Sequence, residues 1–243
     1  MNDPTGEAAP AWESLCSPAT RALIWPYGCW LAGILLLFVP HSFDFPAWVY
    51  AGKTVLCLGL LVWFRPWRFV PFERVRGDLA AGILLGLTVY VLWVLPEVLP
   101  WPAWVRAYQC WAMMMPGSLP DSSASWCYAW QSSPMLALIK LVGSAFVIAP
   151  IEEFFFRGWL MRWLTCKNWQ RLPLEHVSRR AFWLTALFFA AEHDRIVVGL
   201  LAGLVYGALA VRSGSLRAPI VAHITTNLIL GLHVLFLDAY GFW

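Results

Sequence analysis

Long apolar stretches alternate with short polar segments along this chain, and that pattern predicts membrane helices. About 20 apolar residues are needed to cross the roughly 30 Å hydrocarbon core of a bilayer. Stretches of about this length lie at residues 21–40, 46–64, 79–97, 134–165, 179–194, 196–212 and 216–238. We therefore expect an all-α fold, a polytopic transmembrane helical bundle with about seven membrane helices.

Two stretches leave the helix count open between seven and eight. Residues 134–165 are too long for a single crossing, so this helix either projects beyond the membrane or breaks at Pro150. Residues 101–115 carry Trp, Tyr and Met with one Arg, a composition that suits an interfacial helix better than a crossing. A crossing there would raise the count to eight and reverse the orientation of every later helix.

The basic residues favour seven crossings, because Lys and Arg collect in cytoplasmic loops. If the N-terminus is inside, the cytoplasmic basic residues are Arg21, Arg65, Arg68, Arg74, Arg76, Arg162, Lys167, Arg171, Arg179, Arg180, Arg212 and Arg217. Only Arg106 and Arg195 then fall outside. We expect a cytoplasmic tail at residues 1–20 and a single transmembrane domain at residues 21–243, with the chemically interesting motifs in 148–230.

Composition supports a membrane protein and argues against nucleic-acid binding. Hydrophobic residues make up 60% of the chain and charged residues 13%, against about 25% charged residues in soluble domains. The net charge of +3 comes from basic residues in short loops, where lipid headgroups and membrane orientation explain them. Membrane lipid is thus an expected partner. Cys110 and Cys127 share one outer loop, and either a disulfide or two free thiols fits a periplasmic location.

The segment IAPIEEFFFRGWL, residues 148–160, places three charges inside an apolar stretch. Each such charge costs roughly 2.5–3.5 kcal/mol at the bilayer centre. Helix positions four apart share a face, whereas positions five apart diverge by about 140°. Glu153 and Arg157 are therefore expected to pair, while Glu152 has no partner on its own helix. A purely structural charge cluster against another helix is the alternative interpretation.

Two further apolar stretches carry polar side chains that could work with Glu152. His193 ends the fifth stretch, one turn after Phe189, and the last stretch places His223 and Asn227 on one face at positions i and i+4. A carboxylate and an imidazole that share one water can take its proton as it attacks a carbonyl. A second imidazole and an amide can donate hydrogen bonds to the oxygen that becomes negative. These residues together indicate a hydrolase.

A metal-dependent site is the main alternative to this metal-free chemistry. Glu152, His193 and His223 could supply a catalytic zinc site with two histidines and one carboxylate. Against zinc, no two histidines stand at i and i+4 on one helix, as they do in HExxH. We therefore expect no cofactor. Glu192 and Asp194 flank His193 off its helical face, so we attribute them to a hydrated helix end, with a supporting role as the alternative.

The motifs EExxxR, FxxxH and HxxxN occur in this order, and GSLRAP precedes the last histidine. This pattern resembles the type II CAAX prenyl endopeptidase family, also called the CPBP or Abi family of glutamic-type intramembrane proteases, over residues 148–230. The resemblance implies a water activated by Glu152 and His193. It implies an oxyanion stabilised by His223 and Asn227, and support from Glu153 and Arg157. The N-terminal half is more weakly similar to bacterial members linked to exosortase-type sorting systems.

The expected function is an intramembrane endopeptidase that cuts a protein substrate near its C-terminal, membrane-embedded or lipidated end. The expected location is the bacterial inner membrane, with several crossings and a cytoplasmic N-terminus. Two other classes stay open. One is a non-catalytic binding or immunity protein on the same scaffold, and the other is a proton-coupled transporter in which intramembrane Glu and His side chains relay protons.

Overall fold

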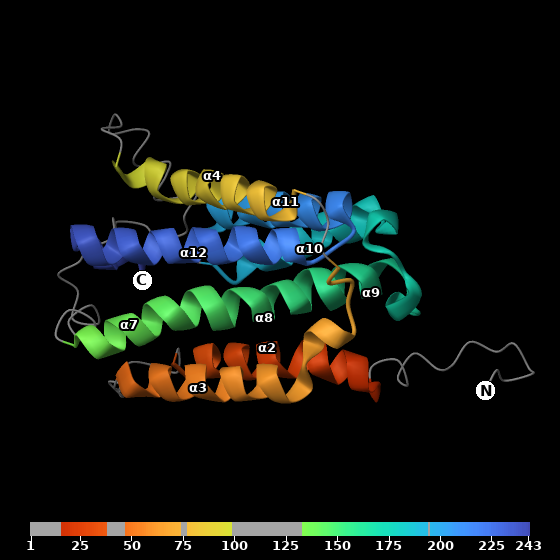
Figure 1. Cartoon of the computed structure of the whole chain (residues 1–243), viewed down its shortest axis with the longest axis horizontal. Helices are drawn as coiled ribbons and strands as arrows, with labels where there is room; N and C mark the ends of the chain where they lie inside the picture. The colour runs from red at the N-terminus through yellow and green to blue at the C-terminus, as the bar shows by residue number, and fades with distance from the viewer. Residues whose placement is uncertain (1–15, 38–46, 74–76, 99–132, 194) are drawn as a thin grey trace, which may run out of the picture.

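The computed structural model is a helical bundle (Figure 1), and the part of the chain that it describes, residues 16–37, 47–73, 77–98, 133–193 and 195–243, contains no strand. The main helices are α2 (Pro18–Leu37), α3 (Ala47–Phe64), α4 (Asp78–Val98), α7 (Pro134–Gly143), α8 (Ala149–Glu153), α9 (Met161–Thr165), α10 (Arg179–Ala191), α11 (Ile196–Ser213) and α12 (Arg217–Leu237). Helices α7, α8 and α9 follow one another along a central line, with α2 and α3 on one side and α12, α4, α10 and α11 on the other. The all-α prediction is confirmed.

Four stretches of the described residues are long and apolar enough to cross a membrane. They are Asp78–Pro96, Pro134–Thr165, Ile196–Ser213 and Arg217–Leu237. The chain is therefore an integral membrane protein. Helices α2 and α3 coincide with two of the predicted crossings but are not among these four, so the count of seven to eight crossings is not confirmed. Residues 101–115, with Arg106, lie outside the described residues, as do Arg74, Arg76, Cys110 and Cys127.

Residues Pro134–Thr165 form one long helix that continues through Pro150. Because the helix is continuous, the predicted alternative of a break at Pro150 is wrong. Its 32 residues extend about 48 Å, which is longer than the hydrocarbon core is thick. Two segments, Ser144–Ile148 and Phe154–Leu160, have the wider turn of a π-helix. A proline ring crowds the carbonyl four residues earlier. The wider turn that ends at Ile148, two residues before the proline, makes room for the ring and keeps the helix continuous.

Helix α10 is shorter than the crossing predicted at residues 179–194. Its 13 residues end at Ala191 and rise about 20 Å. The backbone N–H of His193 donates to the carbonyl of Ala190, three residues earlier, so the chain has already left the α-helix there. Helix α11 begins at Ile196 and packs against α10. The two helices form a hairpin whose turn carries His193 and the buried Arg195.

Helices α4 and α12 pack closely because small residues line their contact. A Cβ atom added to Gly86 of α4 would lie 2.4 Å from the carbonyl oxygen of Ala222 on α12. One added to Gly82 would lie 2.9 Å from the carbonyl oxygen of Ala218. Small residues four apart are what allows the backbones of membrane helices to approach. Helix α4 thereby fixes the position of α12, which carries two of the predicted site residues.

Most of the basic side chains lie at one end of the bundle, which we call the basic end. Helices α9 and α11 end there, and α10 and α12 begin there (Figure 1). Its basic residues are Arg21, Arg65, Arg68, Arg162, Lys167, Arg171, Arg179, Arg180, Arg212 and Arg217. The other end, where α7 begins and α12 ends, is called the far end. The grouping agrees with the predicted one-sided distribution of Lys and Arg.

Candidate functional site

The site begins with a buried charge pair on the long helix. The Arg157 guanidinium donates from Nη1 to Glu153 Oε1 at 2.8 Å, and both side chains are fully buried. Arg157 Nη2 also donates to the carbonyl oxygen of Gly203 on α11, at 2.9 Å. The predicted pairing of Glu153 with Arg157 is confirmed. The pair anchors the long helix to α11.

His223 on α12 adds a third member to this pair. Its Nδ1 lies 2.9 Å from Glu153 Oε1, the same oxygen that Arg157 binds. Because a carboxylate oxygen only accepts hydrogen bonds, Nδ1 carries the proton. Tyr206 stacks on the imidazole at 4.8 Å between ring centroids. Glu153 and Tyr206 thus fix the orientation of His223, and its Nε2 lies 3.6 Å from Glu152 Oε2.

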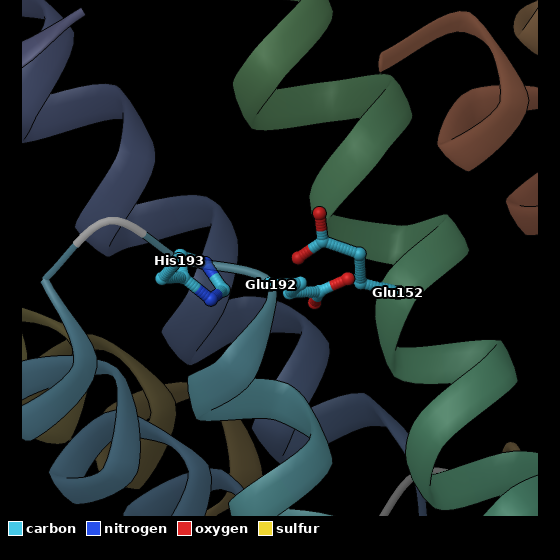
Figure 2. Close-up of side chains that lie close together, drawn as sticks. All are labelled: Glu152, Glu192 and His193. Atoms are coloured by element: carbon cyan, nitrogen blue, oxygen red, sulfur yellow. The ribbon is translucent and has the colours of Figure 1, made fainter. Parts of the chain in front are cut away.

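Glu152 also lies close to two side chains that follow α10. Its carboxylate, the Glu192 carboxylate and the His193 imidazole each place one atom within 4.8 Å of the others. Figure 2 shows Glu192 and His193 just after the end of α10, facing Glu152 on the long helix. We call these three residues, together with His223, the carboxylate–histidine cluster. One water that donates to or accepts from two groups joins atoms about 4.5 Å apart, so a single water can bridge Glu152 and His193.

The ring orientation of His193 is set by the backbone. Its Nδ1 lies 2.7 Å from the carbonyl oxygen of Phe189, which can only accept, so the proton is on Nδ1. In the neutral imidazole, Nε2 then has the lone pair. The FxxxH spacing therefore has a direct physical meaning here, because the residue four positions before the histidine fixes its tautomer.

Asn227 lies one turn after His223 on α12, and its amide is partly engaged. Nδ2 donates to the carbonyl oxygen of Ser144 at 3.1 Å, in the first wide turn of the long helix. An amide nitrogen carries two protons, so the second remains for another acceptor. Asn227, Glu152, His193 and His223 all line one cavity of about 230 Å³. The structure therefore brings the four predicted catalytic residues together, with Glu153 and Arg157 directly behind them.

Glu192 is the cluster residue whose place the sequence analysis did not foresee. Its Oε2 accepts a 2.5 Å hydrogen bond from the Tyr27 hydroxyl on α2. The helical-wheel argument placed Glu192 off the face of His193, but that argument fails because α10 ends at Ala191. A turn after the helix lets both neighbours point the same way. The signal available in the sequence was a carboxylate next to the motif histidine at a helix end.

The same geometry bears on metal binding. Among the described residues, Glu152, Glu192 and His193 are the group whose ligand atoms lie close enough to hold one ion. This set differs from the zinc alternative drawn from the sequence, because Glu192 takes the place of His223. Nδ1 of His223 is bound to Glu153. Two carboxylates and one imidazole suit several divalent metals.

A family model matches part of the chain. The model of the family described as type II CAAX prenyl endopeptidase Rce1-like matches residues 132–229. No curated protein and no solved structure matches the chain. The matched segment runs from just before α7 into α12 and includes every member of the carboxylate–histidine cluster. The resemblance inferred from the motifs is confirmed, and the link to sorting-associated bacterial members stays a prediction. Residues 132–229, about two fifths of the chain, thus match the Rce1-like family of type II CAAX prenyl endopeptidases.

Proposed function

We propose that the chain is an intramembrane endopeptidase that hydrolyses a peptide bond near the C-terminal, membrane-embedded or lipidated end of a protein substrate. The family match supports a CAAX-type intramembrane protease in general. One observation carries the specific chemistry: the Glu152 carboxylate and the His193 imidazole lie within 4.8 Å of each other in the cavity. That separation fits a shared water.

In the proposed reaction, the water oxygen attacks the carbonyl carbon while Glu152 takes one of its protons. His193 accepts a hydrogen bond from the second proton at Nε2 and thereby aims the attacking lone pair. The tetrahedral intermediate then collapses as the C–N bond breaks. The leaving amine takes the proton held by Glu152. The products are one chain with a new carboxylic acid, which keeps the second proton of the water, and one tail fragment with a new amine, so no other reactant is consumed.

Asn227 and His223 are proposed to stabilise the negative oxygen of the intermediate. The Asn227 amide has one proton beyond the one given to Ser144. His223 donates from Nδ1 to Glu153, so it can donate from Nε2 only as an imidazolium. The carboxylates of Glu153 and Glu152 lie 2.9 Å and 3.6 Å from its ring nitrogens. Donors that are already fixed in position stabilise developing charge strongly.

A metal-assisted hydrolysis is the second candidate mechanism, because Glu152, Glu192 and His193 are close enough to hold an ion. A bound divalent metal would lower the pKa of its water and polarise the substrate carbonyl. In the metal-free mechanism, cleavage survives chelator and purified protein carries no stoichiometric metal. Loss of cleavage with chelator, restored by one metal, would favour the metal site.

The decisive test compares Glu152→Gln with Glu73→Gln, a matched change at an exposed glutamate. Membrane proteins from cells that express each variant are compared by mass spectrometry of their C-termini. Glu152→Gln should abolish the shortened C-termini, whereas Glu73→Gln should leave them unchanged. Cleavage that survives in Glu152→Gln would remove the proposed base.

The same pair of variants separates the other function classes. A non-catalytic binding or immunity protein would shorten no C-termini even with Glu152 intact. A proton-coupled transporter would lose uptake in Glu152→Gln without any proteolysis.

A further inference from the structure

The cavity extends from the carboxylate–histidine cluster toward one end of the bundle. On the long helix it is lined by Lys140, Ser144, Ile148 and Glu152. These residues are spaced four apart, so they mark a single helix face about 18 Å long. Glu152 is the last lining residue of this helix. The lined face therefore runs from the cluster toward Pro134, where α7 begins at the far end.

Several aromatic residues of other helices line the cavity on the far-end side of the cluster. Trp30 lies in the second half of α2, and Trp93 lies in the last third of α4. Tyr50 lies in the first turn of α3, and Trp243 follows α12. Helices α2 and α4 end at the far end, α3 begins there, and α12 ends there (Figure 1). Every one of these side chains thus lies on the far-end side of the bundle centre.

On the basic-end side of Glu152, packed side chains close the cavity along the long helix. Phe156 and Met161 are buried at 1% and 0% exposure, and Arg162 is bound to the carbonyls of Leu172 and Gln170. In the described part of the chain, none of the residues after Glu152 on this helix lines the cavity. A substrate that reaches Glu152 therefore comes along the lined face from the far end.

The distribution of Lys and Arg indicates which end of the bundle faces the cytoplasm. Lys and Arg in short loops mark the cytoplasmic face. The basic end carries the loop residues Lys167 and Arg171 and the helix-terminal residues Arg179, Arg212 and Arg217. By this rule the basic end is cytoplasmic, and the far end faces the other compartment.

We propose that the site takes its substrate from the non-cytoplasmic side of the membrane. The substrate class is a protein whose scissile segment has already been translocated and enters the cavity past Lys140 and Ser144. The inference rests on the proposed function for its biological meaning. The direction of access is, however, a property of the cavity alone and is tested without any proteolysis.

The experiment uses two thiols in the full-length membrane-embedded chain. One is introduced by Ser144→Cys inside the cavity, and the other is the native Cys166, which is exposed at the end of α9. The remaining native cysteines are replaced by alanine. Cells stripped of their outer wall expose the non-cytoplasmic face, and inverted membrane vesicles expose the cytoplasmic face. A membrane-impermeant maleimide is added to each, and the modified peptides are quantified by mass spectrometry.

The expected result is opposite labelling of the two thiols. The thiol from Ser144→Cys should react in wall-stripped cells and at least tenfold less in inverted vesicles, and Cys166 should show the reverse. Reaction of both thiols from the same face would overturn the proposal, and so would no reaction at position 144 from either face. Lys140→Cys, one turn nearer the far end, repeats the test if Ser144→Cys lowers the melting temperature. The labelling test measures access to the cavity, and the Glu152→Gln test measures cleavage. Either proposal can therefore be refuted without the other.

Discussion

Replacing Arg157 with methionine tests whether the buried charge pair holds the site together. The guanidinium donates to Glu153 at 2.8 Å and to Gly203 at 2.9 Å, and neither it nor the glutamate is exposed. Breaking a buried pair by removing one partner leaves the other charge without compensation and costs about 3–5 kcal/mol. We expect Arg157→Met to lose about that much stability. Because His223 binds the same Glu153 oxygen, cleavage should fall as well.

The double variant Glu153→Gln with Arg157→Met isolates the charge from the lost packing. Removing both charges removes the uncompensated carboxylate, so the double variant should melt at a higher temperature than Arg157→Met alone, although it should stay inactive. Thermal melting in one detergent, at fixed protein and salt concentration, orders the variants. The change in stability of the double variant should be smaller than the sum of the two single changes.

Arg162→Met supplies the matched control. Arg162 is 2% exposed and donates to the carbonyl oxygens of Leu172 and Gln170 rather than to Glu153. Its loss should destabilise the chain, but Glu153→Gln should not restore any of that stability. The account of the charge pair would be refuted if Arg157→Met melted like the wild type. It would also be refuted if Glu153→Gln rescued Arg162→Met as well as Arg157→Met.

Three further outcomes are expected. Tyr27→Phe removes the hydroxyl that donates to Glu192, so detergent melting should show a loss of about 1–3 kcal/mol, and cleavage should slow although Tyr27 lies outside the matched family segment. Gly86→Leu should prevent the close packing of α4 and α12 and reduce folded yield in size-exclusion chromatography, whereas Gly52→Leu, where an added Cβ meets nothing within 4 Å, should not. Asn227→Ala should lower kcat by about 10²–10³ with little change in KM, measured on any peptide substrate that the wild type cleaves.

Local spacing along one helix was enough to predict the charge pair. Glu153 and Arg157 stand four apart, and no tertiary information is needed to bring them together. The link between Glu153 and His223 was not predictable in the same way, because 70 residues separate them. Only the packing of α12 against the long helix decides which of two adjacent glutamates meets the imidazole. The motif order located the residues, and the fold assigned their partners.

Helix ends and wide turns explain what the sequence analysis missed. A fixed 100° step per residue assumes that the helix continues, and α10 stops at Ala191 just before Glu192 and His193. The sequence showed Pro150 as a possible break, but apolar periodicity carries no sign of the π-helical turn that keeps the helix continuous. The close contact between α4 and α12 was visible only as two glycines four apart, Gly82 and Gly86. Their partner helix had to come from the structure.

The pairing of Glu153 with Arg157 within a single helix also has a consequence for biosynthesis. Membrane helices emerge from the ribosome one after another, and α12, which carries His223, is among the last to be made. The long helix meets the lipid before that partner exists, yet its two opposite charges already neutralise each other. Glu152 then has no counter-charge one turn away on its own helix. A nascent chain can therefore insert this segment early, and a protein truncated before α12 would sit in the bilayer without a working site.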